Sequence, residues 1–327
     1  MSNLLLTEET FTAKMAEKKA MLDNIASQLN GILSPYTYMT SDEYKNTTLD
    51  PSKLYWVLGD DGKHGVYKNG ILCEGENVLL SLWVRLQNQV RAGIFSKNHS
   101  VGDQLIVKYN GNDTIWDIVA IDVATPADTS KTHSVTLMPH YLLPDYMMFD
   151  NKEPNNTDSG RKSYGNNRYK DSNIRLWLNS DGAAGSWWTA QHDADAAPDY
   201  ATTKAGFMNG FDANFLDVIG ETKIKVVKNT KTDGGSYEEL VDKFYLPSTT
   251  EVGLANENNI AEGALFPYFD SNTKRTKSKS GGSAGHWWLR TPISGNSYRV
   301  RYVDSSGSLY FSYAFLAIGV APACNII

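Results

Sequence analysis

The sequence has few cysteines, no long apolar run and no excess of positive charge. Its two cysteines, Cys73 and Cys324, lie too far apart for a disulfide framework or a zinc motif, so we expect two plain buried thiols. No stretch approaches the roughly 18 apolar residues of a membrane span, and membrane insertion is therefore not expected. The start, MSNLLLTEE, has neither a basic region nor a cleavage site, so we expect no signal peptide.

Charge and motif content argue against several classes of function. The net charge is -6 and no basic stripe is present, so we expect no nucleic-acid partner. Gly281-Gly282-Ser283 does not precede a predicted helix, as a phosphate-binding glycine-rich loop would. His192-Asp193 with Asp195 could begin a metal site, but no further ligand follows at metal-binding spacing. We therefore predict no catalytic residues, no cofactor and no metal, in a protein that is not an enzyme.

Residues 1–35 carry the pattern of one long helix. Thr7 can cap it, Glu8 and Glu9 favour its first turn, and Pro35 stops it. The heptad spacing of its seam predicts an oligomerising coiled coil of three or four helices, and we favour a homotrimer. The alternative is one amphipathic helix packed on the body of its own chain. The seam consists of Phe11, Met15, Lys18, Leu22, Ile25, Leu29 and Ile32.

The rest of the chain is predicted to be α+β. Residues 36–77 alternate short extended runs with turns and are predicted to form a small β-meander. Residues 78–327 are predicted to form one larger domain, opened by a helix at 78–92 and continued by a hairpin around Asn110-Gly111. Asp171 or Ser172 can cap a short helix, as can Asp212, and strands, helices and long loops follow one another without βαβ alternation.

The C-terminal stretch has a restricted residue composition. From residue 295 to residue 327 there is no Lys, Glu, Gln, Met or Trp, although Trp287, Trp288 and Lys279 come shortly before. Codons AAC and AAT, randomised at their two adenines, encode Tyr, Phe, Ser, Leu, Ile, Asp, Arg and Asn, but never those five residues or a stop. Eleven positions in the stretch carry residues of this set, and we predict that they bind ligand: Tyr298, Arg299, Tyr302, Asp304, Tyr310, Phe311, Ser312, Tyr313, Phe315, Leu316 and Ile318.

The residues between these positions are expected to be scaffold. Strand alternation would bury only one of Tyr310 and Phe311, so some large side chains must face outward, and contiguous exposed aromatics mark interaction surfaces. Tyr supplies contact area with few rotors, and Arg299 and Asp304 can add charged hydrogen bonds. The alternative is that the aromatics fill a core between two strands. The expected scaffold residues are Val300, Arg301, Val303, Gly307, Leu309, Ala314, Gly319 and Val320.

This frame resembles the variable proteins of diversity-generating retroelements. The resemblance rests on Trp287-Trp288-Leu289-Arg290-Thr291-Pro292, Val300-Arg301 and Gly319-Val320-Ala321-Pro322-Ala323. Upstream, Tyr164-Gly165-Asn166-Asn167-Arg168 and Leu246-Pro247-Ser248-Thr249-Thr250-Glu251 are similar to a phage and gut-bacterial family. The resemblance covers residues 78–327 and implies a C-type-lectin-like (formylglycine-generating-enzyme-like) fold, in which adenine-directed mutagenesis varies residues 296–318.

The resemblance also implies where such a protein acts. Residues 36–75 are similar to small β-modules of phage tail and fibre proteins, which implies a virion receptor-binding protein whose ligand is a host surface protein or glycan. Glu153-Pro154-Asn155 coincides with the calcium motif of true C-type lectins but lacks its Trp-Asn-Asp partner, so no calcium site is inferred. Formylglycine-generating enzymes use paired cysteines, and this half of the chain has only Cys324. A structural virion decoration protein and an enzyme on the same fold remain the alternatives.

Overall fold

The structure, a computed structural model, describes residues 36–59, 62–68, 71–75, 81–255 and 258–327, together with Glu17, Lys18 and Ala20. Those three residues are helical, and the remainder of the predicted coiled coil at 1–35 lies outside the described residues. The chain divides into two compact units, Met1–Leu86 and Gln87–Ile327, and each is described by itself.

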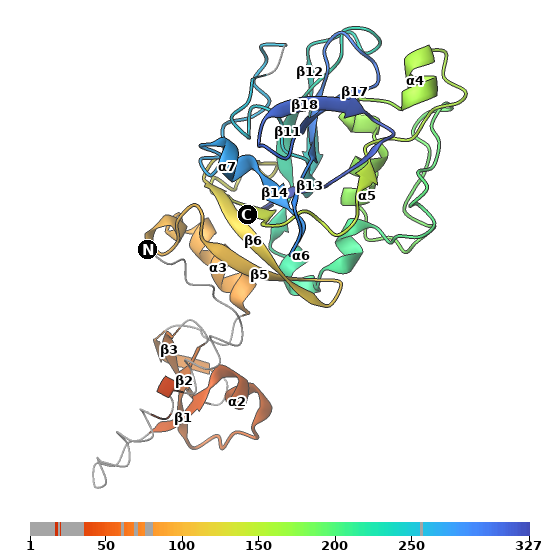
Figure 1. Cartoon of the computed structure of the whole chain (residues 1–327). Helices are drawn as coiled ribbons and strands as arrows, with labels where there is room; N and C mark the ends of the chain where they lie inside the picture. Colours follow the sequence, from red (N-terminus) through yellow and green to blue (C-terminus); the bar gives the residue numbers. More distant parts are fainter. Residues whose placement is uncertain are drawn as a thin grey trace. The chain divides into compact units, whose positions relative to one another are not determined.

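The first unit contains a four-stranded sheet of order β1-β2-β3-β4 (Figure 1). Strands β2 to β4 form the predicted antiparallel meander. Strand β1, however, pairs with β2 in parallel, and the short helix α2, Ser41–Asn46, is part of the connection between the two strands. Thr40 and Glu43 form a capping box at the start of α2. The core contains Tyr44, Tyr55, Val57 and Tyr67. The strands are β1 (Tyr36–Thr40), β2 (Leu54–Leu58), β3 (His64–Lys68) and β4 (Ile71–Gly75).

Cys73 lies on β4 and is exposed, which corrects the expectation that both thiols are buried. The strand is the last of its sheet, so its outer edge has no neighbouring strand among the described residues. Cys324, by contrast, is fully buried in the second unit.

The second unit is built on a six-stranded sheet of order β10-β20-β8-β6-β5, with β13 also paired to β20. The hairpin β5–β6 turns at Asn110 and Gly111, both with positive φ, as predicted for this dipeptide. The C-terminal strand β20 lies between β10 and β8, so the end of the chain is part of the core. The strands are β5 (Gln104–Tyr109), β6 (Asn112–Ile121), β8 (Val135–Pro139), β10 (Ile219–Gly220), β13 (Phe244–Tyr245) and β20 (Ala323–Ile326).

Smaller sheets cover this core. They are β12-β11-β7, β16-β17-β18, β14-β15 and β19-β9. Their strands are β7 (Thr125–Pro126), β9 (Met147–Met148), β11 (Thr222–Val227), β12 (Tyr237–Asp242), β14 (Lys277–Ser278), β15 (Ala284–Gly285), β16 (Trp287–Pro292), β17 (Arg299–Val303), β18 (Leu309–Tyr313) and β19 (Ala317–Ile318).

The helices are short, and side chains cap several of them. Ser172 caps α5 and Asp212 caps α6, each accepting a hydrogen bond from the backbone three residues on, as the sequence predicts. The α-helices are α3 (Leu82–Arg91), α4 (Ser159–Tyr164), α5 (Asn173–Leu178), α6 (Ala213–Leu216) and α7 (Asn272–Arg275). The 3-10 helices are η1 (Phe95–Lys97), η2 (Tyr169–Asp171) and η3 (Phe207–Gly210).

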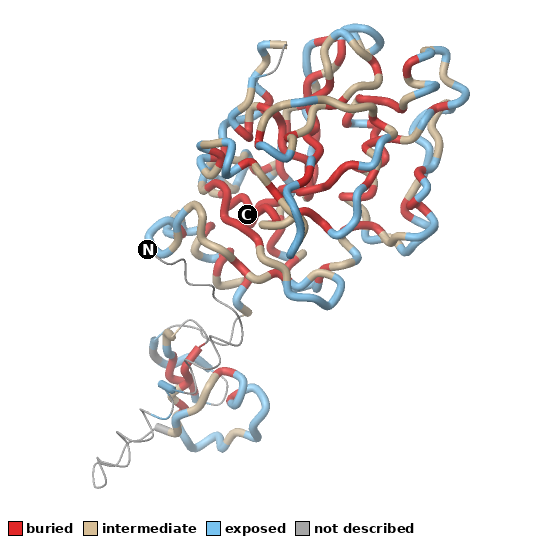
Figure 2. Tube along the Cα trace, viewed as in Figure 1, coloured by how far each residue is buried: buried red, intermediate tan, exposed pale blue. Residues whose placement is uncertain are grey.

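The described part of the chain is therefore α+β, with most of its regular structure in sheets. Figure 2 shows the buried segments concentrated along the strands of the second unit, with exposed residues in the loops around them. None of the described helices has the length and apolar character that a membrane span requires.

Candidate ligand-binding surface

Most of the residues predicted to bind ligand lie on the antiparallel sheet β16-β17-β18 and the segment after it (Figure 1). Strand β16 is buried along its whole length. Strand β18 is at the edge of the sheet. Across β17 and β18, Arg299 faces Tyr313 and Arg301 faces Phe311, so these four side chains share one face of the sheet.

Burial differs between the predicted scaffold and the predicted contact positions. Six of the eight scaffold residues are buried, and Arg301 and Leu309 are half-buried. Among the eleven contact positions, Tyr310 and Leu316 are exposed at 55% and 40%, and eight others are half-buried. The eleventh, Ile318, is only 8% exposed because β19 pairs it with Met147 of β9. Its side chain is part of the scaffold in this structure.

Seven rings form two neighbouring groups, which together we call the aromatic patch: Tyr164, Tyr298, Tyr313 and Phe315 in one, and Tyr302, Tyr310 and Phe311 in the other. The ring centre of Tyr313 lies 4.5 Å from that of Tyr164 and 5.7 Å from that of Tyr298. At the other end, Tyr310 stacks on Phe311 with ring centres 5.2 Å apart and lies 5.8 Å from Tyr302. The patch therefore presents several large rings side by side, and none of them is fully buried.

Tyr164 was not among the predicted contact residues, although its ring contacts those of Tyr298, Tyr313 and Phe315. It is the last residue of α4, and its carbonyl accepts a hydrogen bond from the backbone N–H of Phe315 at 3.1 Å. Close packing requires glycine at position 160 of this helix, because a Cβ there would lie 2.2 Å from the Tyr298 ring. The sequence signal for Tyr164 was its place in the motif of residues 164–168.

Three cations, Arg299, Arg301 and Lys152, lie over the rings of the patch, and Arg301 is the most distant, at 6.0 Å from the ring centre of Phe311. The guanidinium carbon of Arg299 is 4.9 Å from the ring centre of Phe311, 5.6 Å from that of Tyr313 and 5.7 Å from that of Tyr298. It thereby connects the two ends of the patch. The Lys152 ammonium lies 4.4 Å from the ring centre of Phe315. All of these distances are within the range of a cation–π interaction.

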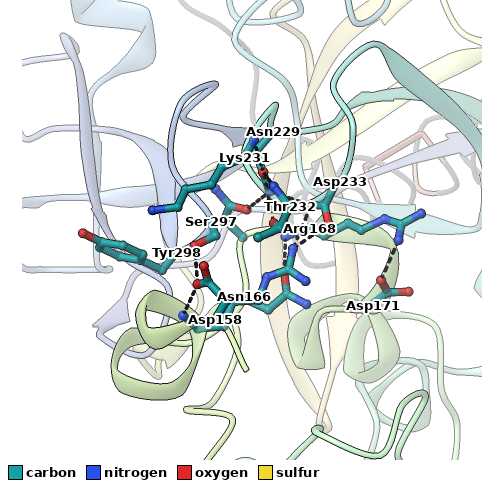
Figure 3. Close-up of polar contacts among 12 residues, drawn as sticks. Asp158, Asn166, Arg168, Asp171, Asn229, Lys231, Thr232, Asp233, Ser297 and Tyr298 are labelled. Carbon is teal, nitrogen blue, oxygen red and sulfur yellow. Dashed lines mark hydrogen bonds and ion pairs between the residues drawn. The ribbon is translucent and has the colours of Figure 1, made fainter. Parts of the chain in front are cut away.

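A buried network of asparagines fixes the start of β17. Asn167 donates from Nδ2 to the carbonyls of Asn296 and Arg299 at 2.6 and 3.0 Å. Asn229 donates to Oδ1 of Asn167 at 2.8 Å. Its own Oδ1 accepts the backbone N–H groups of Lys231 and Thr232, and these three residues are labelled in Figure 3. Both asparagines are fully buried. The backbone beneath Arg299 is therefore held by side chains distant in the sequence.

A second polar contact supports the same segment. Ser297 donates from Oγ to Oδ1 of Asp158 at 2.6 Å, and that oxygen also caps α4 through the N–H of Arg161 at 2.9 Å. Desolvation opposes ionisation of Asp158, but these hydrogen bonds lower the pKa of its carboxyl overall. Figure 3 shows the ring of Tyr298 pointing away from this polar network.

Asp304, a predicted contact residue, uses its carboxylate within its own turn. Oδ1 accepts hydrogen bonds from the Ser306 hydroxyl at 2.6 Å and from the backbone N–H groups of Ser306 and Ser308. Partial desolvation works against the charge, but these bonds lower the pKa of Asp304 below its usual range. The carboxylate therefore orders the β17–β18 turn in this structure.

An acidic pair lies beneath the patch and stabilises the adjoining loops. Asp150 accepts the backbone N–H groups of Asn166 and Asn173, each at 3.0 Å, and complete burial raises its pKa well above the usual range. Glu153 of the Glu-Pro-Asn sequence accepts hydrogen bonds from the side chains of Asn166 and Asn156, and desolvation raises its pKa. Glu153 thus holds loop structure from a buried position.

The interior also holds a buried ion pair. Arg290 of β16 binds Glu251 through two contacts of 2.6 and 2.8 Å. Beside it, Glu262 accepts the backbone N–H of Val227 at 2.9 Å and the Thr291 hydroxyl at 2.5 Å. Complete burial raises the pKa of Glu262 to about 7. These contacts hold β16 in place, and β16 pairs with β17, which in turn pairs with β18.

Other chemistry-bearing residues do not converge on the patch. Asp117 contacts His140 Nδ1 at 2.9 Å and Gln104 Nε2 at 2.9 Å, and burial lowers the pKa of the neighbouring Lys277 to about 8. His192 lies 3.3 Å from Asp171. Within the described residues, no group of three or more His, Cys, Asp or Glu residues is arranged to hold a metal.

The segment Gly281-Gly282-Ser283-Ala284-Gly285 has the spacing of a nucleophile elbow but not its geometry. It occupies an exposed turn that leads into β15, whereas an elbow requires a strand followed by a helix. Ser283 is exposed on this turn. The spacing alone therefore supports no hydrolase site.

Comparison with known proteins gave one match. A family model described as a domain of unknown function (DUF6273) matches residues 134–327, which is more than half of the chain. The matched region contains every residue of the aromatic patch and the strands from β8 to β20. No match was found among curated proteins or among solved structures.

Proposed function

The chain belongs to the family of the domain of unknown function DUF6273, and we propose that it is a ligand-binding display protein whose contact surface is the aromatic patch. In this proposal the chain is the variable protein of a diversity-generating retroelement. It serves as a receptor-binding protein of a phage or prophage and recognises a host-surface ligand. Its role is binding, with no catalysed reaction.

One observation carries the proposal. Ten of the eleven predicted contact positions are half-buried or exposed, whereas six of the eight expected scaffold residues are buried; Ile318, Arg301 and Leu309 depart from this division. Val300, Val303, Ala314 and Val320 are each 0% exposed, whereas Tyr310 is 55% exposed. A surface that varies without loss of the fold needs this division, because substitution of buried residues costs far more stability than substitution of exposed ones.

The chemistry of the patch also supports binding. Contiguous exposed aromatic side chains are uncommon on surfaces without a partner. Tyrosine combines a large apolar face with a hydroxyl and loses little conformational entropy on binding, which is why evolved contact surfaces use it. Arg299 and Lys152 add charge over the rings.

The proposal also includes the fold of the second unit and the assembly of the chain. The second unit is taken to have a C-type-lectin-like fold, and residues 1–35 a trimeric coiled coil that groups three patches on the virion. Grouping would raise avidity, since the second and third contacts become intramolecular. Light scattering tests the assembly: the intact chain should have three times its monomer mass, and a variant lacking residues 1–35 should be monomeric. Equal subunit numbers for both would contradict the coiled coil.

A cell-binding measurement tests the function. The labelled protein is incubated with a panel of bacterial strains, and the double variant Tyr310→Ser and Phe315→Ser is compared with it. Serine is reachable by the same adenine substitutions, so a folded protein with a different contact surface is expected. Binding should be lost from the strain that the original chain recognises.

The matched control replaces Tyr146, which is 45% exposed and outside the patch, by Ser. This variant should keep full binding. Equal cell binding by the double variant would contradict the proposal. Loss of virion assembly, with cell binding unchanged, would instead identify a structural decoration protein.

A further inference from the structure

Among the described residues, Arg299 has no counter-ion. Its guanidinium lies among three rings of the patch, and within the described residues it makes no ion pair. Its Nε is shielded from solvent and has no hydrogen-bond acceptor. The two terminal nitrogens are not shielded in this way and make no hydrogen bond within the described residues, so they are the atoms to which a ligand's acceptor could bind.

Four other arginines of the same unit are paired. Arg161, Arg168, Arg175 and Arg290 each contact a carboxylate at 2.6 to 2.8 Å. Arg275 instead donates to carbonyl oxygens of its own surroundings. Among the described residues, Arg299 has neither kind of acceptor. The contrast identifies Arg299 as a group available to a ligand.

A second cation of the patch also lacks an acid partner. Lys152, over Phe315, makes no ion pair within the part of the chain that the structure describes. The carboxylates of Asp304 and Asp158 keep their negative charge, but they accept hydrogen bonds from serine hydroxyls and backbone N–H groups and contact neither cation. The patch thus combines aromatic rings with these two cations, each of which could pair with an acidic group of a ligand.

The free edge of β18 is the second feature. Backbone bonds join Asp304 to Ser308 and Ala314 to Tyr298, and in antiparallel pairing such bonds recur at every second residue. The backbone N–H and C=O groups of Leu309 and Phe311 consequently point away from β17. No hydrogen bond to these groups occurs within the described residues. An extended chain could pair with them by strand addition.

The Arg299 guanidinium and the free edge of β18 are close enough for one ligand to contact both. Arg299 belongs to β17, but its guanidinium is 4.9 Å from the ring centre of Phe311 on β18. The positively charged end of the Arg299 side chain therefore lies near a residue of β18, the strand with the free edge. A strand added there would lie about 4.8 Å beyond β18, so a glutamate on it could reach the guanidinium.

We propose that the ligand of this surface is an acidic, extended segment of a protein, which adds as a strand to the edge of β18 and places a carboxylate against Arg299. This inference rests on the proposed binding function and names the class of ligand. Tyrosine and arginine are enriched at protein interfaces, and only a polypeptide offers main-chain partners to Leu309 and Phe311. A carboxylate can accept two hydrogen bonds from one guanidinium.

Binding of defined polymers to the intact chain tests the inference. The probes are a random copolymer of glutamate and tyrosine, polygalacturonate as an acidic glycan, and polylysine. Affinity is measured by interferometry at low salt and again at rising salt for the original chain, Arg299→Gln and Lys97→Gln. Lys97 is exposed on η1, outside the patch, and controls for the loss of one positive charge.

The copolymer should bind, and rising salt should weaken it. Arg299→Gln should lower the affinity about tenfold, the size expected when a charge-assisted hydrogen bond is lost. Lys97→Gln and the original chain should bind alike, and polygalacturonate and polylysine should bind much more weakly. In hydrogen exchange, the amides of Leu309 and Phe311 should be protected when the copolymer is added.

Several results would overturn the inference. They are no binding of the copolymer, equal binding by Arg299→Gln, equal or tighter binding of polygalacturonate, or unchanged exchange at both amides. Cell binding separates this failure from failure of the proposed function. If the Tyr310 and Phe315 variant loses cell binding while Arg299→Gln keeps it, the surface binds but its ligand is not acidic.

Discussion

Tyr313 on β18 stacks on Tyr164 at the end of α4, with ring centres 4.5 Å apart and ring planes inclined by 24°. The pair joins a helix to the edge strand of a sheet far along the sequence. A Tyr313 side chain held in this way loses less freedom when a partner binds, which favours affinity. Tyr164 is therefore both a contact surface and a support for Tyr313.

The stacking energy can be measured by a double-mutant cycle. Tyr164→Ala and Tyr313→Ala should each lower the free energy of unfolding, and the double variant should lose about 1 kcal/mol less than the sum, because stacked rings contribute about that much. Denaturant unfolding of the four proteins gives the coupling. Tyr164→Ala with Tyr237→Ala, whose ring is outside the patch, should be additive. Additivity of the first pair would show that the rings are not coupled.

Asn229 is expected to be a key support of the patch. Replacing it by Ala removes the hydrogen bond to Asn167 and leaves the N–H groups of Lys231 and Thr232 without their acceptor. Since Asn229 is fully buried, the free energy of unfolding should fall by about 3 kcal/mol. Asn209→Ala, at an exposed position with one hydrogen bond, should cost less than about 1 kcal/mol. Equal losses for both would contradict this role.

The sequence predicted local features better than distant contacts. Ser172 and Asp212 cap their helices, and Asn110-Gly111 makes the hairpin turn, because each signal acts within a few residues. The parallel pairing of β1 with β2 and the contact of Asn167 with Asn229 depend on chain crossings that no local pattern encodes. Tyr164 was missed for the same reason.

Within the binding stretch, Ile318 is the predicted contact position that the structure buries. Residue composition selected Ile318 because isoleucine belongs to the allowed set. The pairing of β19 with β9 buries it, and that pairing depends on Met147, far upstream. Composition can therefore identify which positions are able to vary, but only the tertiary structure decides which side chains face solvent.

Glu262 should make stability depend on pH. Burial raises its pKa from 4.5 to about 7, so the folded chain keeps a proton that the unfolded chain has lost between these values. The resulting stabilisation is complete below about pH 4.5 and is lost as the pH rises through about 7. Relative to the original chain, Glu262→Gln should therefore become more stable by about 3 kcal/mol between pH 4.5 and pH 8.

Urea unfolding of both proteins across this range measures the difference. Glu239→Gln, at an exposed position of β12, serves as the control and should follow the original chain at every pH. A constant difference between Glu262→Gln and the original chain would contradict the raised pKa.

The two thiols should differ in reactivity. Cys73 is exposed, whereas Cys324 is fully buried and its pKa is raised well above the usual range, which suppresses the thiolate. A disulfide reagent should modify one thiol of the folded chain and two in denaturant. Cys73→Ser should leave no rapidly reacting thiol, and fast modification of Cys324 in that variant would contradict its burial.

The coding DNA tests the central claim, that the C-terminal surface is diversified for binding, most directly. At positions 298, 299, 302, 304, 310–313, 315, 316 and 318, every codon should end in a pyrimidine. A near-copy of this stretch with AAC or AAT at those positions should lie close by, beside a gene for a reverse transcriptase. Purines at the third bases, or a locus without such a copy, would contradict the claim.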